Sequence, residues 1–126
     1  MEGIRYAQEK IEGTMSLAIM TEDSILCARD KSGRLPILIG ERSDGYCFSF
    51  ESFAYQKLGY ETCHELKAGE ILKLTKDGYE ILAEGTDQMK ICTFLWTYYG
   101  YPTACYEGVN VELMRTRNGE IMQSRI

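Results

Sequence analysis

The amino-acid sequence predicts an α+β protein in which antiparallel β-sheet is flanked by helices. Short apolar segments are separated by turn residues, and the Asp-Gly pairs within residues 44–45 and 77–78 are strong local signals for β-hairpins. Helix signals lie near both ends of the chain. Residues 17–20 and 37–39 are apolar at successive positions, which is typical of strands covered on both faces. We therefore expect a sheet with other material packed on both of its sides.

The first half of the chain predicts one helix followed by two hairpins. Residues 3–12 form an amphipathic pattern with Ile4, Ala7 and Ile11 on one face. Polar residues 21–24 then separate two apolar segments, as expected for a hairpin loop. The strands expected in this half are residues 15–20, 25–28, 35–40 and 46–50.

The middle of the chain predicts a short helix and a further hairpin. The helix is expected over residues 52–58, with Phe53, Ala54 and Leu58 facing inward and Gly59 as its left-handed stop. The hairpin strands are expected at residues 70–74 and 79–82, joined by a turn that contains Gly78.

Two elements are expected in the last third. Residues 91–99 are mostly apolar and predict a last strand. The final helix is expected to begin at Asn110, because the Asn side chain can accept a hydrogen bond from the first helical turn.

Length and composition limit the function classes. A chain of 126 residues is expected to form one domain, residues 1–126. A net charge of −5 provides no basic surface, so nucleic acid is an unexpected partner, and no apolar segment is long enough to span a membrane. The five cysteines are well separated and odd in number, which favours reduced thiols and a cytoplasmic protein.

Five segments of the chain form an ordered set of motifs. Residues 29–37 read Arg-Asp-Lys-Ser-Gly-Arg-Leu-Pro-Ile, and residues 49–54 read Ser-Phe-Glu-Ser-Phe-Ala. The first is similar to the Arg-Asp-Pro-x-Gly-Ile-Arg-Pro-Leu stretch of the amidophosphoribosyltransferases, and the second to their Ala-Ser-Glu-Ser-x-Ala segment. The other segments that resemble this family are residues 68–70, 94–104 and 108–117.

The resemblance implies a fold and a pathway. It covers the later part of the family's class II glutaminase domain, and so implies a partial N-terminal-nucleophile hydrolase fold of the αββα type. Members of the family use ammonia from glutamine to displace pyrophosphate from phosphoribosyl pyrophosphate in purine nucleotide biosynthesis.

The same resemblance implies that the chemistry of the family lies outside the matched segments. The nucleophilic Cys, the glutamine-binding Arg and Asp and the oxyanion-hole Asn-Gly of the family all precede them, and the phosphoribosyltransferase domain follows them. The chain begins Met1-Glu2, with no amino-terminal nucleophile. We therefore expect no catalytic, cofactor-binding or metal-binding residues and no cofactor in this chain, and no glutamine hydrolysis by the chain alone. Two alternatives stay open: a non-catalytic binding or assembly module, and the complementing half of a split glutamine amidotransferase.

Three individual positions attract functional interpretations. Cys92 lies where some family members place one ligand of an iron–sulfur cluster, but a cluster needs four thiolates, so a small buried apolar residue is the preferred interpretation. His64 follows Cys63 on an extended segment, where neighbours point to opposite faces, so the histidine is expected to face solvent. Ser52, or Ser49 in its place, is interpreted as a helix cap.

The apolar segments also predict assembly. If part of the family's second sheet is missing, one apolar face is left uncovered, and monomers rarely expose large apolar patches. We expect a homodimer through the apolar sheet face, with residues 95–99 at or near the contact, or a complementing amidotransferase half in the same place.

Overall fold

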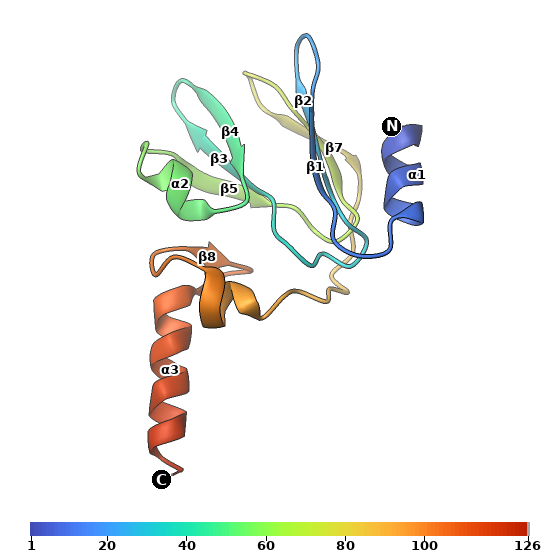
Figure 1. The fold of residues 1–126 in the computed structure, drawn as a ribbon. Coiled ribbons are helices and arrows are strands. Elements are labelled where there is room, and N and C mark those ends of the chain that lie inside the picture. Colours follow the sequence, from blue (N-terminus) through green and yellow to red (C-terminus); the bar gives the residue numbers. More distant parts are fainter. Residues whose placement is uncertain (126) are drawn as a thin grey trace.

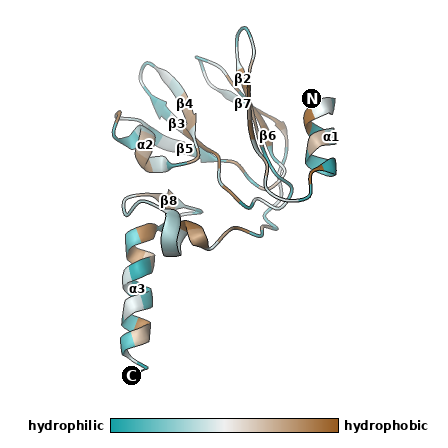
Figure 2. Cartoon of the chain, in the orientation of Figure 1, coloured by the Kyte–Doolittle hydropathy of each residue, from teal (hydrophilic) through white to brown (hydrophobic). Residues whose placement is uncertain are grey.

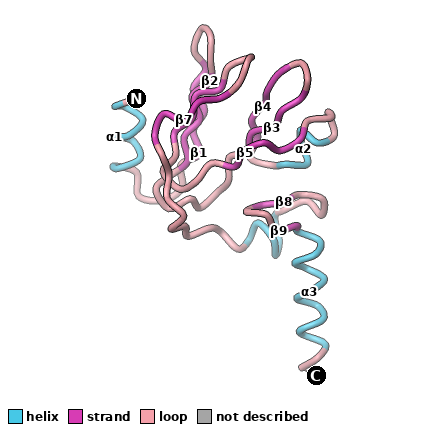
Figure 3. Tube along the Cα trace, turned by 180° about the vertical axis from the view of Figure 1, so that it is seen from behind, coloured by secondary structure: helices cyan, strands magenta, loops and turns pink. Residues whose placement is uncertain are grey.

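The molecule contains two antiparallel sheets that lie side by side, with a smaller C-terminal unit beside the second sheet (Figure 1). The computed structural model describes residues 1–125. The same arrangement is visible from behind, where the last helix projects away from the sheets (Figure 3). The expected α+β class is therefore confirmed.

The first sheet has four strands in the order β1-β2-β6-β7, all antiparallel. Helix α1, Glu2–Lys10, packs on it through Ile4, which is buried with Met15, Ala28 and Ile71. The strands are β1 (Ser16–Met20), β2 (Ile25–Arg29), β6 (Ile71–Leu74) and β7 (Tyr79–Ala83).

The second sheet has three strands in the order β4-β3-β5. They are β3 (Leu38–Arg42), β4 (Gly45–Ser49) and β5 (Glu61–Glu65), and the short helix α2 (Ser52–Gln56) packs on them. Gly40 permits this packing, because a Cβ atom there would lie 2.9 Å from Cys47 Sγ and 3.0 Å from the Tyr55 ring.

A shared apolar core joins the two sheets. Cys27 and Leu72 from the first sheet are fully buried with Ile39 from the second, and Ile37 and Leu66 complete the same cluster. The successive apolar residues 37–39, at the start of β3, are therefore covered on both faces, as the sequence pattern indicates. The same expectation is wrong for residues 17–20, because β1 is an edge strand and residues 18–20 are exposed.

The C-terminal unit, residues 94–123, has its own small core. It contains a short π-type helix η1 (Leu95–Tyr99), a two-residue hairpin of β8 (Cys105–Tyr106) and β9 (Val109–Asn110), and helix α3 (Val111–Gln123). Trp96 and Tyr106 pack edge to face with their ring centroids 5.9 Å apart. Figure 2 shows both hydrophilic and hydrophobic residues along the projecting part of α3.

Most of the predicted elements are confirmed. The hairpins at residues 15–28 and 70–83, the turns at Gly45 and Gly78, and the N-terminal helix occur as expected. Asn110 caps α3, since its Oδ1 atom accepts a hydrogen bond from the Leu113 amide at 3.0 Å. Among the described residues no helix has the length and apolar character needed to cross a membrane.

The predicted strand at residues 91–99 is wrong, because Leu95–Tyr99 forms η1 and residues 91–94 form no strand. Strand propensity of aromatic residues is overridden by tertiary contacts. Arg115 of α3 donates hydrogen bonds to the carbonyl oxygens of Trp96 (2.7 Å) and Gly100 (2.9 Å), and these bonds hold the segment in its tight turn.

Two further details differ from expectation. In α2 the inward side chain is Tyr55, whereas Ala54 and Leu58 are exposed, because the helix is only one turn long and the chain turns away after Gln56. Strand β5 was not predicted, since Glu61–Glu65 is mostly polar and gains its strand structure by pairing with β3.

Candidate functional site

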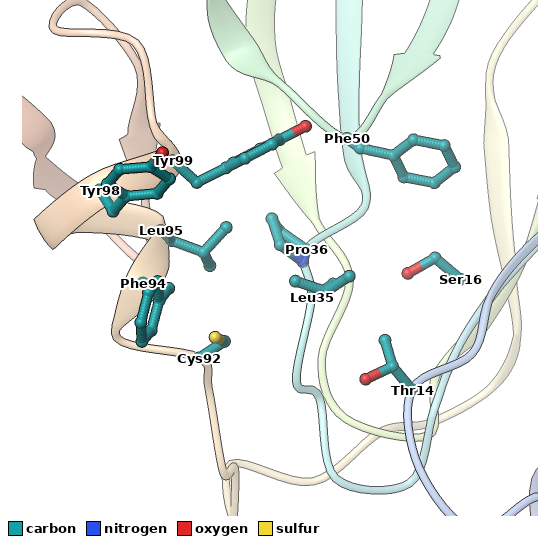
Figure 4. Close-up of a pocket in the computed structure, with 10 residues that line it drawn as sticks. All are labelled: Thr14, Ser16, Leu35, Pro36, Phe50, Cys92, Phe94, Leu95, Tyr98 and Tyr99. Carbon is teal, nitrogen blue, oxygen red and sulfur yellow. The ribbon is translucent and has the colours of Figure 1, made fainter.

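An apolar pocket of about 600 Å³ lies between the first sheet, the second sheet and η1. Figure 4 shows the aromatic side chains of η1 on one side of it, Thr14 and Ser16 on the other, and Leu35 and Pro36 between them. Its lining residues carry no formal charge and are Thr14, Ser16, Leu35, Pro36, Phe50, Cys92, Phe94, Leu95, Tyr98 and Tyr99.

The rim of this pocket is unusually exposed for aromatic residues. The exposed fractions are 81% for Tyr98, 66% for Tyr99 and 63% for Phe94. Contiguous exposed apolar side chains are uncommon on the surface of a monomer, so this rim is a candidate contact surface.

The pocket offers little catalytic chemistry. Its polar groups are the hydroxyls of Thr14, Ser16, Tyr98 and Tyr99 and the thiol of Cys92, and no carboxylate, histidine, lysine or arginine lies among its lining residues. Nucleophilic catalysis by a hydroxyl or thiol requires an adjacent base or a lowered pKa. The geometry therefore favours apolar contact over bond cleavage.

A buried polar cluster lies where the C-terminal unit meets the sheets. Arg29 has no exposed surface, and its guanidinium lies 2.8 Å from a carboxylate oxygen of Glu107. It also donates hydrogen bonds to the carbonyl oxygens of Gly33 (2.8 Å) and Leu66. Oε2 of Glu65 accepts a hydrogen bond from the Glu107 amide at 3.0 Å.

The pKa of Glu65 is raised to about 7 in this cluster. Burial of the carboxyl is the main cause, and the nearby Glu107 carboxylate adds to it, whereas Arg29 acts in the opposite direction. The cluster thus contains a carboxyl group that gains or loses its proton near neutral pH.

The Arg29-Asp30 motif has a structural role. The backbone carbonyl of Asp30 accepts hydrogen bonds from Gly33 (3.0 Å) and Gly69 (2.9 Å), and its side chain accepts one from Ser32 at 2.8 Å. Gln8 of α1 donates a hydrogen bond to the Arg29 carbonyl at 2.8 Å. These contacts connect α1, the first sheet and the loop before β3.

The prediction that His64 faces solvent is wrong. Its Nε2 atom lies 2.5 Å from Oε1 of Glu70, a residue with 1% exposure, and its ring stacks on Tyr79 at 5.2 Å between centroids. Cys63 contacts the Ile39 carbonyl instead. The structure does not bring the histidine and the thiol together as a base and a nucleophile.

Glu51 and Ser52 hold the C-terminal unit rather than cap α2. The Ser52 hydroxyl accepts a hydrogen bond from the Cys105 amide at 2.9 Å, and Glu51 accepts one from the Tyr106 hydroxyl at 2.5 Å. Sequence reasoning missed this role because the partners lie more than fifty positions away.

The thiols are poorly suited to nucleophilic attack. Burial raises the pKa of Cys27 to about 11 and also raises the pKa values of Cys47, Cys63 and Cys105. These thiols are therefore protonated at neutral pH. Cys92 packs against the core of the C-terminal unit. Within residues 1–125 no group of three or more His, Cys, Asp or Glu residues is placed to hold a metal ion.

Comparisons with known proteins agree with the motifs. No family model matches the chain. The amidophosphoribosyltransferase of Rattus norvegicus is 27% identical over 93% of this chain, and that of Methanocaldococcus jannaschii is 29% identical over 97%. The chain spans only 26% and 29% of these two relatives, respectively.

Solved structures show the same fold. Glutamine phosphoribosylpyrophosphate amidotransferase from B. subtilis, in complex with ADP and GMP, superposes with a TM-score of 0.89 and 24% identity. The match covers 99% of this chain and 28% of that protein. An enzyme described as the allosteric regulatory enzyme of purine biosynthesis gives a TM-score of 0.88. The expected N-terminal-nucleophile hydrolase-type fold is confirmed. Over nearly all of its own length, and about a quarter of theirs, the chain is similar in sequence and in fold to the amidophosphoribosyltransferases.

Proposed function

We propose that the chain is a glutaminase-domain segment of the amidophosphoribosyltransferase type, that it serves purine nucleotide biosynthesis, and that residues 1–125 do not hydrolyse glutamine by themselves. Similarity to the relatives supports the first two parts. The third part rests on one observation: within residues 1–125 no thiol is hydrogen-bonded to a side-chain base, and the hydroxyls of Thr21 and Ser24 that bond Asp23 lie in an exposed hairpin turn.

The chemical reason lies in the surroundings of the reactive side chains. His64 forms a hydrogen bond with Glu70. The thiol nearest to it in sequence, Cys63, donates to the Ile39 carbonyl instead. Since burial raises the pKa of the Cys63 thiol, little thiolate exists at neutral pH. Loss of a single oxyanion donor costs an enzyme roughly 10²–10³ in rate, so a segment without an activated nucleophile is expected to show no measurable turnover.

Ammonia release from glutamine tests this proposal. We expect no release above a blank that contains buffer and heat-inactivated protein. Release that is proportional to chain concentration and is lost in Cys63→Ala or Cys92→Ala would refute the inactive state and would identify the thiol. Release that persists in both variants would also contradict it unless it separates from the chain on gel filtration.

A role in assembly is the second candidate, and the exposed pocket favours it. We propose that a second copy of the chain covers the surface formed by Phe94, Tyr98 and Tyr99, with a complementing amidotransferase half as the alternative occupant. Aromatic side chains bury 150–250 Å² each, so the exposed parts of these three rings amount to roughly 300–500 Å² per copy. Two copies would bury about 600–1,000 Å² through these rings alone, a large part of the ~1,200–2,000 Å² of a stable interface. In this proposal the contact is centred on Phe94 and η1, since residues 37–39 of the second sheet are already buried in the core.

Light scattering at micromolar concentration tests this assembly. The proposal is supported by a dimer mass that falls to a monomer mass in Tyr98→Ser but not in the control Tyr6→Ser, which changes another exposed tyrosine, on α1. A monomer mass for the unmodified chain refutes the second copy and leaves the complementing half as the occupant. A cytoplasmic location is part of the same proposal, and the five free thiols support it.

A further inference from the structure

The C-terminal unit is fastened to the sheets by a small number of polar contacts at its hairpin. Ser52 accepts a hydrogen bond from the Cys105 amide, and Glu51 accepts one from the Tyr106 hydroxyl. Glu107 donates its amide hydrogen bond to Glu65 and forms an ion pair with Arg29. Figure 1 shows the unit beside β5 and α2, reached through a long connection after β7. The hairpin is therefore the part of the unit whose polar contacts decide how firmly it is docked.

Glu107 is held in an unusual conformation at the turn of this hairpin. Its φ angle is +48°, in the left-handed region that non-glycine residues rarely adopt. Such conformations persist when surrounding contacts enforce them. The contacts here are the hydrogen bond that the Glu107 backbone amide donates to Oε2 of Glu65 and the ion pair of Glu107 with Arg29.

The charges in the cluster do not balance when both carboxyl groups are ionised. Glu65 and Glu107 then carry two negative charges against the single positive charge of Arg29, and Arg29 is completely buried. Oε1 of Glu65 is also buried without a hydrogen-bond partner. One proton on Glu65 removes the excess charge and supplies a hydroxyl that can donate toward Glu107.

We propose that Glu65, Glu107 and Arg29 form a proton-operated latch, in which a proton on Glu65 fastens the β8–β9 hairpin to β5 and its loss loosens the C-terminal unit. The one covalent bond that changes is the O–H bond of the Glu65 carboxyl group, whose proton is exchanged with water.

The other groups that face Glu65 do not supply a competing charge near neutral pH. They are Tyr55 of α2 and Cys105 and Tyr106 of β8, and burial raises the pKa of each of them. They are therefore neutral in this pH range. The state of the latch depends on Glu65 with Arg29 and Glu107 as its charged neighbours.

The direction of the effect follows from linkage. The pKa of Glu65 is about 7 in the folded chain, above the ordinary value of about 4.3 for an unfolded chain. Such a group gives its full stabilisation below the unfolded value, and the stabilisation is lost as pH rises through the folded value. The hairpin is thus fastened at about pH 6 and loosened at about pH 8.

Trp96 provides a readout beside the latch, because it is the only tryptophan, its ring packs on Tyr106 next to Glu107, and its indole N–H donates to the Val109 carbonyl of the hairpin at 2.9 Å. We expect its fluorescence in the full chain to change with a midpoint near pH 7, and we expect Glu65→Gln to abolish that transition. Glu61→Gln is the matched control, an exposed carboxylate on the same strand, and leaves the transition unchanged.

Two outcomes overturn the latch: a Trp96 signal that is constant between about pH 5.5 and 8.5, and a transition that survives in Glu65→Gln. A second measurement does not require a variant to fold. The ¹³C shift of the Glu65 carboxyl in the unmodified chain is expected to titrate near pH 7, and a midpoint below about 5.5 would refute the proposal.

Discussion

Replacement of Arg29 by methionine tests the role of the buried cluster most severely. Methionine keeps much of the volume of the arginine stem but removes the guanidinium. The carbonyl oxygens of Gly33 and Leu66 then lose a buried donor, and Glu107 loses the cation 2.8 Å away. Each unsatisfied buried acceptor costs about 1–3 kcal/mol. Removal of one partner of a buried ion pair costs about 3–5 kcal/mol.

These terms overlap, so we expect the free energy of unfolding to fall by about 3–5 kcal/mol in Arg29→Met. For a chain of this length the melting temperature should fall by roughly 10–20 °C. The loss should be larger at pH 8 than at pH 6, because Arg29 stabilises the ionised form of Glu65, which is populated above its pKa of about 7.

Urea unfolding followed by circular dichroism and by Trp96 fluorescence measures these quantities. Arg42→Met is the matched control, since Arg42 forms an ion pair with Asp44 on the surface and should change stability little. A loss below about 1 kcal/mol in Arg29→Met, or a loss that is equal at both pH values, would show that the cluster does not hold the fold as described.

Two further substitutions probe the packing of the C-terminal unit and of the second sheet. Tyr106→Phe removes the hydroxyl that donates to Glu51 and should lower the free energy of unfolding by about 1–2 kcal/mol. The control Tyr98→Phe, on the exposed rim, should have no effect. Equal melting curves for the two variants would contradict the Tyr106–Glu51 hydrogen bond. Gly40→Ala places a Cβ atom 2.9 Å from Cys47 Sγ and should lower the free energy of unfolding by about 1–3 kcal/mol. The control Gly119→Ala, in the open part of α3, should be neutral or stabilising. A neutral Gly40→Ala would show that α2 can move away from the sheet.

The parts of the fold that depend on local interactions could be predicted from the sequence. The Asp-Gly turns before Tyr46 and Tyr79 fix their hairpins, and Asn110 caps α3 through an amide three residues away. These features need only neighbouring residues, so their sequence signals are direct.

The parts that depend on distant residues could not be predicted. Residues 95–99 have the composition of a strand, but they are held as a helix by Arg115, by the tight packing at Gly100 and by the burial of Leu95 and Trp96 in the small core. The cluster of Arg29, Glu65 and Glu107 combines β2, β5 and the β8–β9 turn, which are far apart in the sequence, so no spacing of residues predicts it. In the sequence, nothing distinguishes Glu65 or Glu107 from an exposed glutamate, because their burial depends on the packing of the hairpin against β5.

The central claim is that residues 1–125 have the fold of a glutaminase segment without an activated nucleophile. Intact-mass measurement after incubation with an electrophilic glutamine analogue tests it most directly, because such a reagent labels a thiol or hydroxyl that is activated to attack glutamine. We predict no adduct on the folded chain at neutral pH, although iodoacetamide in denaturant should label all five cysteines. A stoichiometric adduct at one residue of the folded chain, competed by glutamine, would contradict the claim.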